Sequence, residues 1–294
     1  MNLSFGLVKT AADEQAEALL AREARWLRAL ESVRELEGQV PRVLEEGTSP
    51  GGRRYLVISM LPMGGDAGGE TRAFTDDHAR FLASLRKARF RAVDFEVSGT
   101  CQWLQRSIAE AGEFASRPAM QTLEESYRDC ETALLYWTGP YVLSQGDFAP
   151  WNIRSLGSQL FVTDWGHAHA DASPLDDVLH YLMIQRALNS RPVTVPVLRQ
   201  AMRRAADFAV QAYPEWSWRA PVIGALTLVY LLGVVLHRSL ARGRIERADR
   251  VVSAYWKLLE KRAAWMEFGD GARTPATHSL RSSGSVPEFL EESR

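Results

Sequence analysis

The sequence is poor in cysteine and has no excess of charge of either sign. Its 294 residues include two cysteines, Cys101 and Cys130, which are too few for a disulfide framework and lack the spacing of metal ligands. We interpret both as reduced thiols of a cytoplasmic protein. The formal net charge is −1 and no Lys/Arg-rich block is present, so nucleic-acid binding is not expected.

The sequence also lacks the apolar segments that mark secreted and membrane proteins. The N-terminal MNLSFGLVKT has no basic region followed by an apolar core, which argues against a secretory signal. The longest apolar run, from Val222 to Leu236, is shorter than the ~18 to 20 residues that span a bilayer. It therefore predicts a buried core helix and no membrane association. The apolar fraction of 46% and charged fraction of 24% are typical of a globular protein.

One segment carries most of the polar residues that suggest chemistry. It extends from Tyr141 to His167 and reads YVLSQGDFAPWNIRSLGSQLFVTDWGH. Two short strands are predicted within it, at residues 153–155 and 159–163. The intervening Leu-Gly-Ser, at residues 156–158, is typical of a hairpin turn.

This hairpin would bring together three side chains with oxygen atoms. Asn152 begins the first strand and Asp164 follows the second, so the two would lie across from each other, with Asp147 on the loop before them. Amide and carboxylate oxygens suit Mg²⁺, which leaves its other positions to water and phosphate. Each residue alone also fits an ordinary turn. Their joint spacing, however, is what phosphoryl transfer requires.

The N-terminal segment contains a second candidate pair. Leu3 to Val8 is predicted to form a strand that ends at Lys9, and a helix is expected from a Thr10 cap to Leu36. Glu23 interrupts the apolar stripe of that helix. A carboxylate that faces a core requires a cation, and Lys9 is the nearest candidate. Alternatively, Glu23 lies at the edge of the stripe and reaches water.

The remaining pattern is mostly helical. Two further strands are expected at residues 40–44 and 55–61, followed by a hinge over Gly64 to Glu70. Helical patterns then occupy residues 75–138, 178–188, 194–212, 222–236 and 245–268, and the tail 269–294 is predicted to be disordered. Arginines around residues 238–250 fit a solvated helix face better than an anion site.

Taken in order, these features resemble the aminoglycoside phosphotransferase and choline kinase family, small-molecule kinases with a protein-kinase-like fold. QGDFAPWNI resembles the catalytic loop of the family, FVTDWG its metal-binding loop and PLDDVLHYL the segment that follows. The resemblance implies an α+β, two-lobe fold. A small antiparallel sheet lobe would occupy residues 1–63 and a mostly helical lobe residues 64–268, with the tail at 269–294.

The resemblance also implies roles for individual residues. Asp147 would orient the acceptor hydroxyl and take its proton, and Asn152 and Asp164 would hold Mg²⁺. Lys9 would bind the α- and β-phosphates of ATP and would be positioned by Glu23.

The resemblance implies two further roles. Backbone groups from Ser59 to Leu61 would hydrogen-bond the adenine of ATP, and Asp177 would support the catalytic loop from below.

The sequence departs from the family pattern at two places. Gln145 stands where the family usually has His, a residue that supports the catalytic loop. The family also has two more strands and a Gly-containing loop before the Lys strand, whereas here Lys9 comes almost at once. Either the natural chain is longer, with a misplaced start, or the chain is a reduced and inactive relative.

The leading hypothesis is an ATP- and Mg²⁺-dependent phosphotransferase that acts on a hydroxyl of a small molecule. The alternative is a nucleotide-binding pseudokinase that acts through a partner. A purely structural helical protein would leave the residues with implied roles unexplained. For the acceptor, Asp171, Trp216, Trp218 and Trp256 are candidates, although aromatic residues in helices usually belong to the core. No acidic pocket that would favour a polycationic antibiotic is evident.

Overall fold

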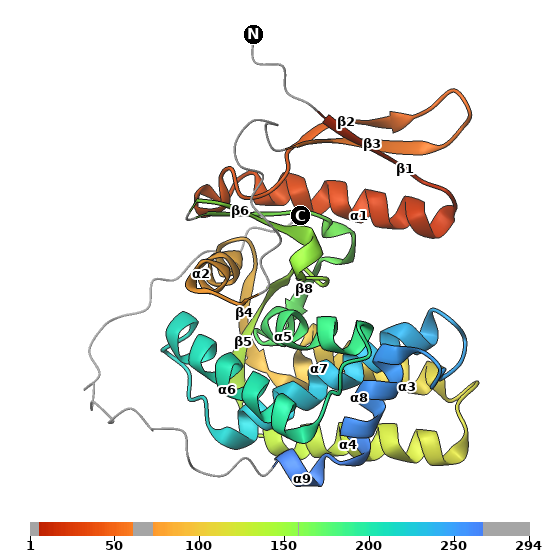
Figure 1. Cartoon of the computed structure of the whole chain (residues 1–294), viewed down its shortest axis with the longest axis vertical. Coiled ribbons are helices and arrows are strands. Elements are labelled where there is room, and N and C mark those ends of the chain that lie inside the picture. Colours follow the sequence, from red (N-terminus) through yellow and green to blue (C-terminus); the bar gives the residue numbers. More distant parts are fainter. Residues whose placement is uncertain (1–5, 61–72, 158, 267–294) are drawn as a thin grey trace, which may run out of the picture.

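The structure is a computed structural model that describes residues 6–60, 73–157 and 159–266. It has a small lobe built on a sheet and a larger, mostly helical lobe (Figure 1). This is the expected α+β, two-lobe fold. The expected division between residues 63 and 64, the hinge over residues 64–70 and the tail 269–294 lie outside the described residues.

The small lobe contains three antiparallel strands and one long helix. The strands β1 (Gly6–Thr10), β2 (Val43–Thr48) and β3 (Arg54–Ser59) are arranged in the order β1-β3-β2. The helix α1 (Glu14–Leu30) lies between this sheet and the rest of the molecule (Figure 1). Alternate side chains of β3, Leu56 and Ile58, are buried, as expected for a strand with one face against a core.

The helix α1 is shorter than predicted at both ends. Asp13, not Thr10, caps it, because the Asp13 carboxylate accepts a hydrogen bond of 2.8 Å from the amide of Ala16. Thr10 instead pairs with Tyr55 as the last residue of β1. At the other end the α-helix stops at Leu30, and residues 34–36 form a separate 3-10 turn.

The large lobe holds the remaining helices and two small sheets. In chain order its elements are α2 (Asp76–Ser84), β4 (Phe90–Asp94), α3 (Gly99–Ala111), α4 (Arg117–Leu134), β5 (Thr138–Ser144), β6 (Ile153–Leu156), β7 (Gln159–Val162), β8 (His169–Ala172), α5 (Asp176–Leu188), α6 (Val195–Ala212), α7 (Ala220–Leu240), α8 (Arg250–Glu260) and α9 (Ala263–Met266). The strands form a sheet of order β4-β5-β8 and the hairpin β6-β7.

The uniform helical prediction for residues 75–138 is wrong at β4. This strand pairs with β5 in antiparallel register, with Phe90 opposite Val142. The helix α2 begins as expected after Thr75, whose side chain and backbone form a capping box with His78. The strand β5 is buried along most of its length and leads directly into the loop that carries Asp147.

The predicted core helix is confirmed but is longer than expected. The helix α7 has 21 residues, long and apolar enough by those two criteria alone to cross a membrane. Most of it is buried, and it packs against α3, α4 and α8. Such burial is typical of a helix in a protein core. Both cysteines are also buried and free, as expected.

The last predicted helix begins five residues late and is divided in two. The carboxylate of Asp249 accepts hydrogen bonds from the amides of Val251 and Val252, at 2.9 and 3.0 Å, and so caps α8. Arg238 and Arg242 form ion pairs with the same carboxylate. These two arginines therefore stabilise a helix start, and they do not form an anion site.

Candidate active site

Lys9 contacts one carboxylate in each lobe. Its ammonium nitrogen lies 2.7 and 2.8 Å from the carboxylate oxygens of Glu23 on α1 and 3.1 Å from Oδ1 of Asp164. Burial opposes the charge on Lys9, but the two carboxylates outweigh it and raise the pKa of Lys9 above its usual value. The structure therefore brings together three residues that the sequence placed far apart.

Glu23 is the buried member of this group. Its side chain is 2% exposed, so the alternative in which it reaches water is wrong. Besides Lys9, its Oε1 atom accepts a hydrogen bond of 3.3 Å from the backbone amide of Trp165. Trp165 is itself fully buried, directly after Asp164. Glu23 thus fixes α1 to the loop that carries Asp164.

The hairpin places Asn152 beside the loop of Asp164, as predicted. Ile153 pairs with Val162, and the amide of Thr163 donates a 2.9 Å hydrogen bond to the carbonyl of Asn152. Asp164 follows with φ of 61° and ψ of 67°, a left-handed conformation that Asp tolerates better than most residues. Its side chain is 47% exposed and open to a ligand.

Both carboxylate oxygens of Asp147 have hydrogen-bond donors. Oδ2 accepts from Nδ2 of Asn152 at 2.9 Å and from the indole N–H of Trp151 at 3.3 Å, and Oδ1 lies 3.0 Å from Nε2 of His180. Burial opposes ionisation, but the contacts with His180 and the other donors hold the pKa of Asp147 below its usual value. The side chain is therefore a fixed carboxylate at neutral pH.

Gln145 connects the loop of Asp147 to that of Asp164. Its Oε1 atom accepts from the amide of Asp147 at 2.9 Å, while its Nε2 atom donates to the carbonyls of Thr163 and Asp164, at 3.0 and 2.6 Å. A neutral imidazole has one donor and one acceptor, whereas an amide has two donors. The Gln145 amide thus uses its oxygen and both of its N–H donors, at the position where the family usually has His.

Asp177 holds the backbone that leads to Asp147, at the place where the sequence analysis expected it to support the loop. Its buried carboxylate accepts from the hydroxyl of Ser144 at 2.8 Å and from the amides of Gln145 and Gly146, at 2.8 and 3.1 Å. Gly146 has a φ of 83°, and a side chain there would collide with the carbonyl of His167. Asp177 and Gly146 together therefore fix the path of the backbone that leads to Asp147.

His180 is the site residue that the sequence analysis missed. Because the carboxylate of Asp147 can only accept, Nε2 of His180 must carry the proton of their shared hydrogen bond. In the neutral ring, Nδ1 is then an acceptor for the hydroxyl of Tyr230, 3.4 Å away. Tyr230 in turn lies 3.0 Å from the hydroxyl of Tyr255. Tyr230 thus holds the His180 ring from the side of the core, and the ring directs its Nε2–H to Asp147.

The four suggested acceptor residues do not form a pocket around Asp147. Trp256 is buried, Trp216 packs against Phe90, and Trp218 packs against other aromatic rings, so these three belong to the core. Asp171 is engaged by Arg91 at 2.8 Å. The aromatic side chain beside Asp147 is instead Trp151, which is 38% exposed.

The adenine prediction is only partly covered by the described residues. The amide of Ser59 donates to the carbonyl of Arg42 at 2.8 Å, and its hydroxyl accepts from the amide of Arg42. The backbone amide of Ser59 is therefore already hydrogen-bonded within the small lobe. Leu61 lies outside the described residues.

The donor set fits a Mg²⁺ ion that is completed by phosphate. Nδ2 of Asn152 donates to both the carbonyl and the carboxylate of Asp147, and Oδ1 of Asn152 remains an acceptor without a hydrogen-bond donor in the described part of the chain. With the exposed carboxylate of Asp164, this supplies two oxygen ligands. Among the described residues, no three His, Cys, Asp or Glu side chains form a metal site by themselves. Mg²⁺ characteristically takes few protein ligands and binds through substrate phosphates.

The two-lobe fold agrees with the protein-kinase-like fold expected from the sequence. The chain belongs to the phosphotransferase enzyme family, whose model matches residues 7–216. The resemblance seen in the sequence is thereby confirmed. No curated protein sequence matches the chain.

Solved structures of aminoglycoside phosphotransferases share the fold. A thermostable mutant of APH(4)-Ia in ternary complex with AMP-PNP and hygromycin B has a TM-score of 0.58 at 14% identity, over 92% of this chain and 89% of that one. ADP-bound APH(2'')-Ib has a TM-score of 0.54 at 17% identity, over 90% and 88% of the two chains. Identities this low establish the fold alone.

Proposed function

We propose that this protein is an ATP- and Mg²⁺-dependent phosphotransferase that moves the γ-phosphoryl group to a hydroxyl of a small molecule. The observation that carries the proposal is the Lys9 ammonium, which contacts both Glu23 and Asp164, with Asp147 fixed on the neighbouring loop. Phosphoryl transfer needs alignment and neutralised charge more than covalent help from the protein. A cation, two oxygen ligands and one carboxylate supply these requirements.

On the nucleotide side, Lys9 would bind the α- and β-phosphates. Glu23 would hold the ammonium in place while Lys9 exchanges its contact with Asp164 for phosphate oxygens. Asn152 and Asp164 would hold Mg²⁺, which neutralises charge on the phosphates when bound. The buried position of Glu23 favours this role, because an exposed carboxylate would not fix the Lys9 side chain.

On the acceptor side, Asp147 would orient the hydroxyl and accept its proton as the hydroxyl oxygen bonds to the transferred phosphorus. The bond from that phosphorus to the bridging oxygen of ATP breaks in the same transfer, and ADP leaves. The donors from Asn152 and His180 fix the rotamer of Asp147, and the exposed indole of Trp151 offers a surface for the acceptor. We expect a cytoplasmic enzyme, because both cysteines are free.

Calorimetric titration tests the nucleotide half of the proposal. Wild type should bind ATP in the presence of Mg²⁺, and Asp164→Ala should weaken that binding by about tenfold or more while changing Mg²⁺-free binding little. Asp207→Asn, on the exposed face of α6, is the control and should bind as wild type does. The absence of measurable binding by wild type would refute the proposal and its pseudokinase alternative together.

A further inference from the structure

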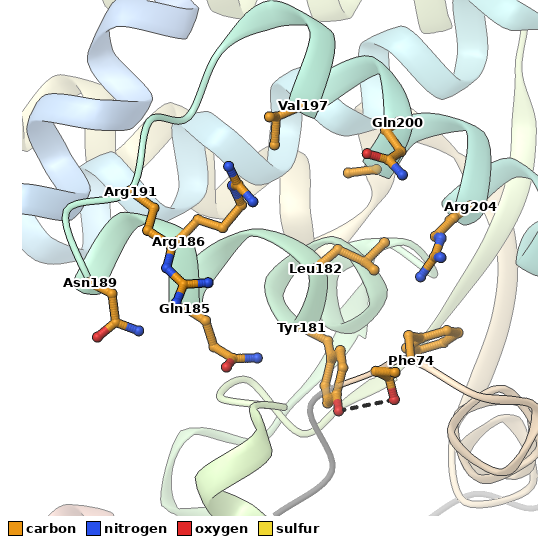
Figure 2. Close-up of a pocket in the computed structure, with 12 residues that line it drawn as sticks. Phe74, Tyr181, Leu182, Gln185, Arg186, Asn189, Arg191, Val197, Gln200 and Arg204 are labelled. Atoms are coloured by element: carbon orange, nitrogen blue, oxygen red, sulfur yellow. Dashed lines mark hydrogen bonds between the residues drawn. The ribbon is translucent and has the colours of Figure 1, made fainter.

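A polar cavity lies between α5 and α6, and its lining includes none of the residues that contact Asp147. It has a volume of about 670 Å³, within the range of small-molecule sites. Phe74 and Tyr181 line one end (Figure 2). Six polar side chains extend into the space from the two helices and their connecting loop, namely Gln185, Arg186, Asn189, Arg191, Gln200 and Arg204.

The described lining of the cavity carries positive charge and no carboxylate. Three of its twelve described lining residues are arginines, and none is Asp or Glu. Arg186 and Arg191 lie on one side and Arg204 on the other (Figure 2). Within residues 6–60, 73–157 and 159–266, none of these arginines forms an ion pair.

Arg186 has unused hydrogen-bonding capacity inside the cavity wall. One of its terminal nitrogens donates to the carbonyl of Pro192 at 3.3 Å, but its buried Nε has no partner among the described residues. By contrast, Arg238 and Arg242 both contact the carboxylate of Asp249. A buried donor without a partner costs free energy. Arg186 therefore lies at the cavity wall with donor capacity that the described residues do not use.

The cavity is separate from the candidate active site. Tyr181 and Gln185 on α5 and Asn189 at its C-terminal cap follow a spacing of four residues and lie on one side of the helix. His180, which contacts Asp147, projects about 100° away from Tyr181 and further still from Gln185. One side of α5 thus lines the cavity, and another side contacts Asp147.

We propose that this cavity is a binding site for a small organic anion, distinct from the nucleotide and the acceptor. Guanidinium groups bind carboxylate and phosphate through paired hydrogen bonds, and the three amide side chains add neutral donors and acceptors. The rings of Phe74 and Tyr181 give an apolar surface at one end. The ligand would carry a phosphate or carboxylate at the arginines and an apolar or aromatic part against the rings.

Calorimetry with three matched probes tests this site without nucleotide. Phenyl phosphate and benzoate carry an anion beside a ring, while benzylamine carries a cation beside the same ring. We expect wild type to bind at least one of the two anions at millimolar concentration and to bind benzylamine more weakly. Equal affinity for benzylamine, or no measurable binding of either anion, would overturn the proposal.

Variants assign the bound anion to the cavity. Arg204 is exposed and has no ion-pair partner among the described residues, so Arg204→Gln should leave the fold intact and weaken anion binding by about tenfold. Arg203→Gln is the matched control on the neighbouring position of α6, outside the cavity, and should bind as wild type does.

Lys9→Gln separates this site from the proposed nucleotide site. It should retain phenyl phosphate binding, because Lys9 lies in the other lobe. Loss of binding in Lys9→Gln, or unchanged binding in Arg204→Gln, would place the anion elsewhere and refute the assignment. The nucleotide site is tested by the separate ATP titration of wild type and Asp164→Ala. Failure of the anion proposal can therefore be distinguished from failure of the proposed function.

Discussion

Replacing Glu23 by Gln removes the carboxylate charge that pairs with the Lys9 ammonium between the two lobes. The wild-type carboxylate accepts two hydrogen bonds from Lys9 and one from the amide of Trp165. An amide has one oxygen for these donors, and its NH₂ group would face the ammonium in either orientation and the Trp165 amide as well in one of them. Both arrangements set a donor against a donor in a buried position.

The expected loss of stability follows from the exposure of Lys9. Breaking a buried ion pair by removing one partner costs about 3 to 5 kcal/mol. The Lys9 side chain is 24% exposed and keeps its contact with Asp164, so we expect a smaller loss than that range, about 2 to 3 kcal/mol. For a chain of 294 residues, an unfolding entropy of about 2.1 cal/mol/K per residue converts this loss into a fall in melting temperature of roughly 3 to 5 °C. Affinity for ATP should fall by about tenfold or more.

The pH dependence of the same variant gives an independent readout. The pKa of Lys9 is raised in the folded state, so its contribution is complete below its unfolded value of about 10.4 and is lost as pH rises through the higher folded value. The difference in stability between wild type and Glu23→Gln should therefore narrow above about pH 10.

Thermal unfolding followed by circular dichroism measures both effects. Glu17→Gln, on the same helix, is the control, because Glu17 forms no ion pair in the described part of the chain, and it should change stability by less than about 0.5 kcal/mol. If Glu23→Gln and Glu17→Gln melt at the same temperature and bind ATP equally, the buried carboxylate does not organise the site.

Three further predictions concern the supporting residues. His180→Phe should lower the phosphotransfer rate about tenfold, measured as ADP release, with unchanged ATP affinity, because it removes one donor from Asp147. Asp177→Ala should lower the unfolding free energy by about 2 to 3 kcal/mol in urea titrations, because its three buried donors lose their acceptor. Although burial opposes ionisation, Arg238 and the capped amides hold the pKa of Asp249 at about 2. Its contribution of about 2 kcal/mol should be present above about pH 4 and disappear as pH falls towards about 2, and an acid titration of Asp249→Asn should lack that loss.

Features set by local sequence were predictable. The hairpin that joins Asn152 to Asp164 was predictable because its turn, its strand lengths and its polar ends agree with one another. Glu23 was recognisable because a carboxylate in an apolar stripe needs a cation.

Features set by distant contacts were not predictable. The strands β4 and β8 are short, and both exist because they pair with β5. The local pattern of β4 did not outweigh the surrounding helical signal, and residues 169–172 of β8 carried no strand signal that led to a prediction. His180 occupies an apolar helix, where a histidine usually belongs to the core. Only the packing of α5 beneath the catalytic loop shows that it contacts Asp147, 33 residues earlier.

The central claim is that Asp147 acts as the base in phosphoryl transfer. The most direct measurement is ADP release with ATP and Mg²⁺ across a panel of amino alcohols, sugars and aminoglycosides, comparing wild type with Asp147→Asn. We predict transfer to at least one acceptor by wild type and a loss of at least about a hundredfold in the variant, with ATP binding retained. Equal rates in the two proteins would contradict the account.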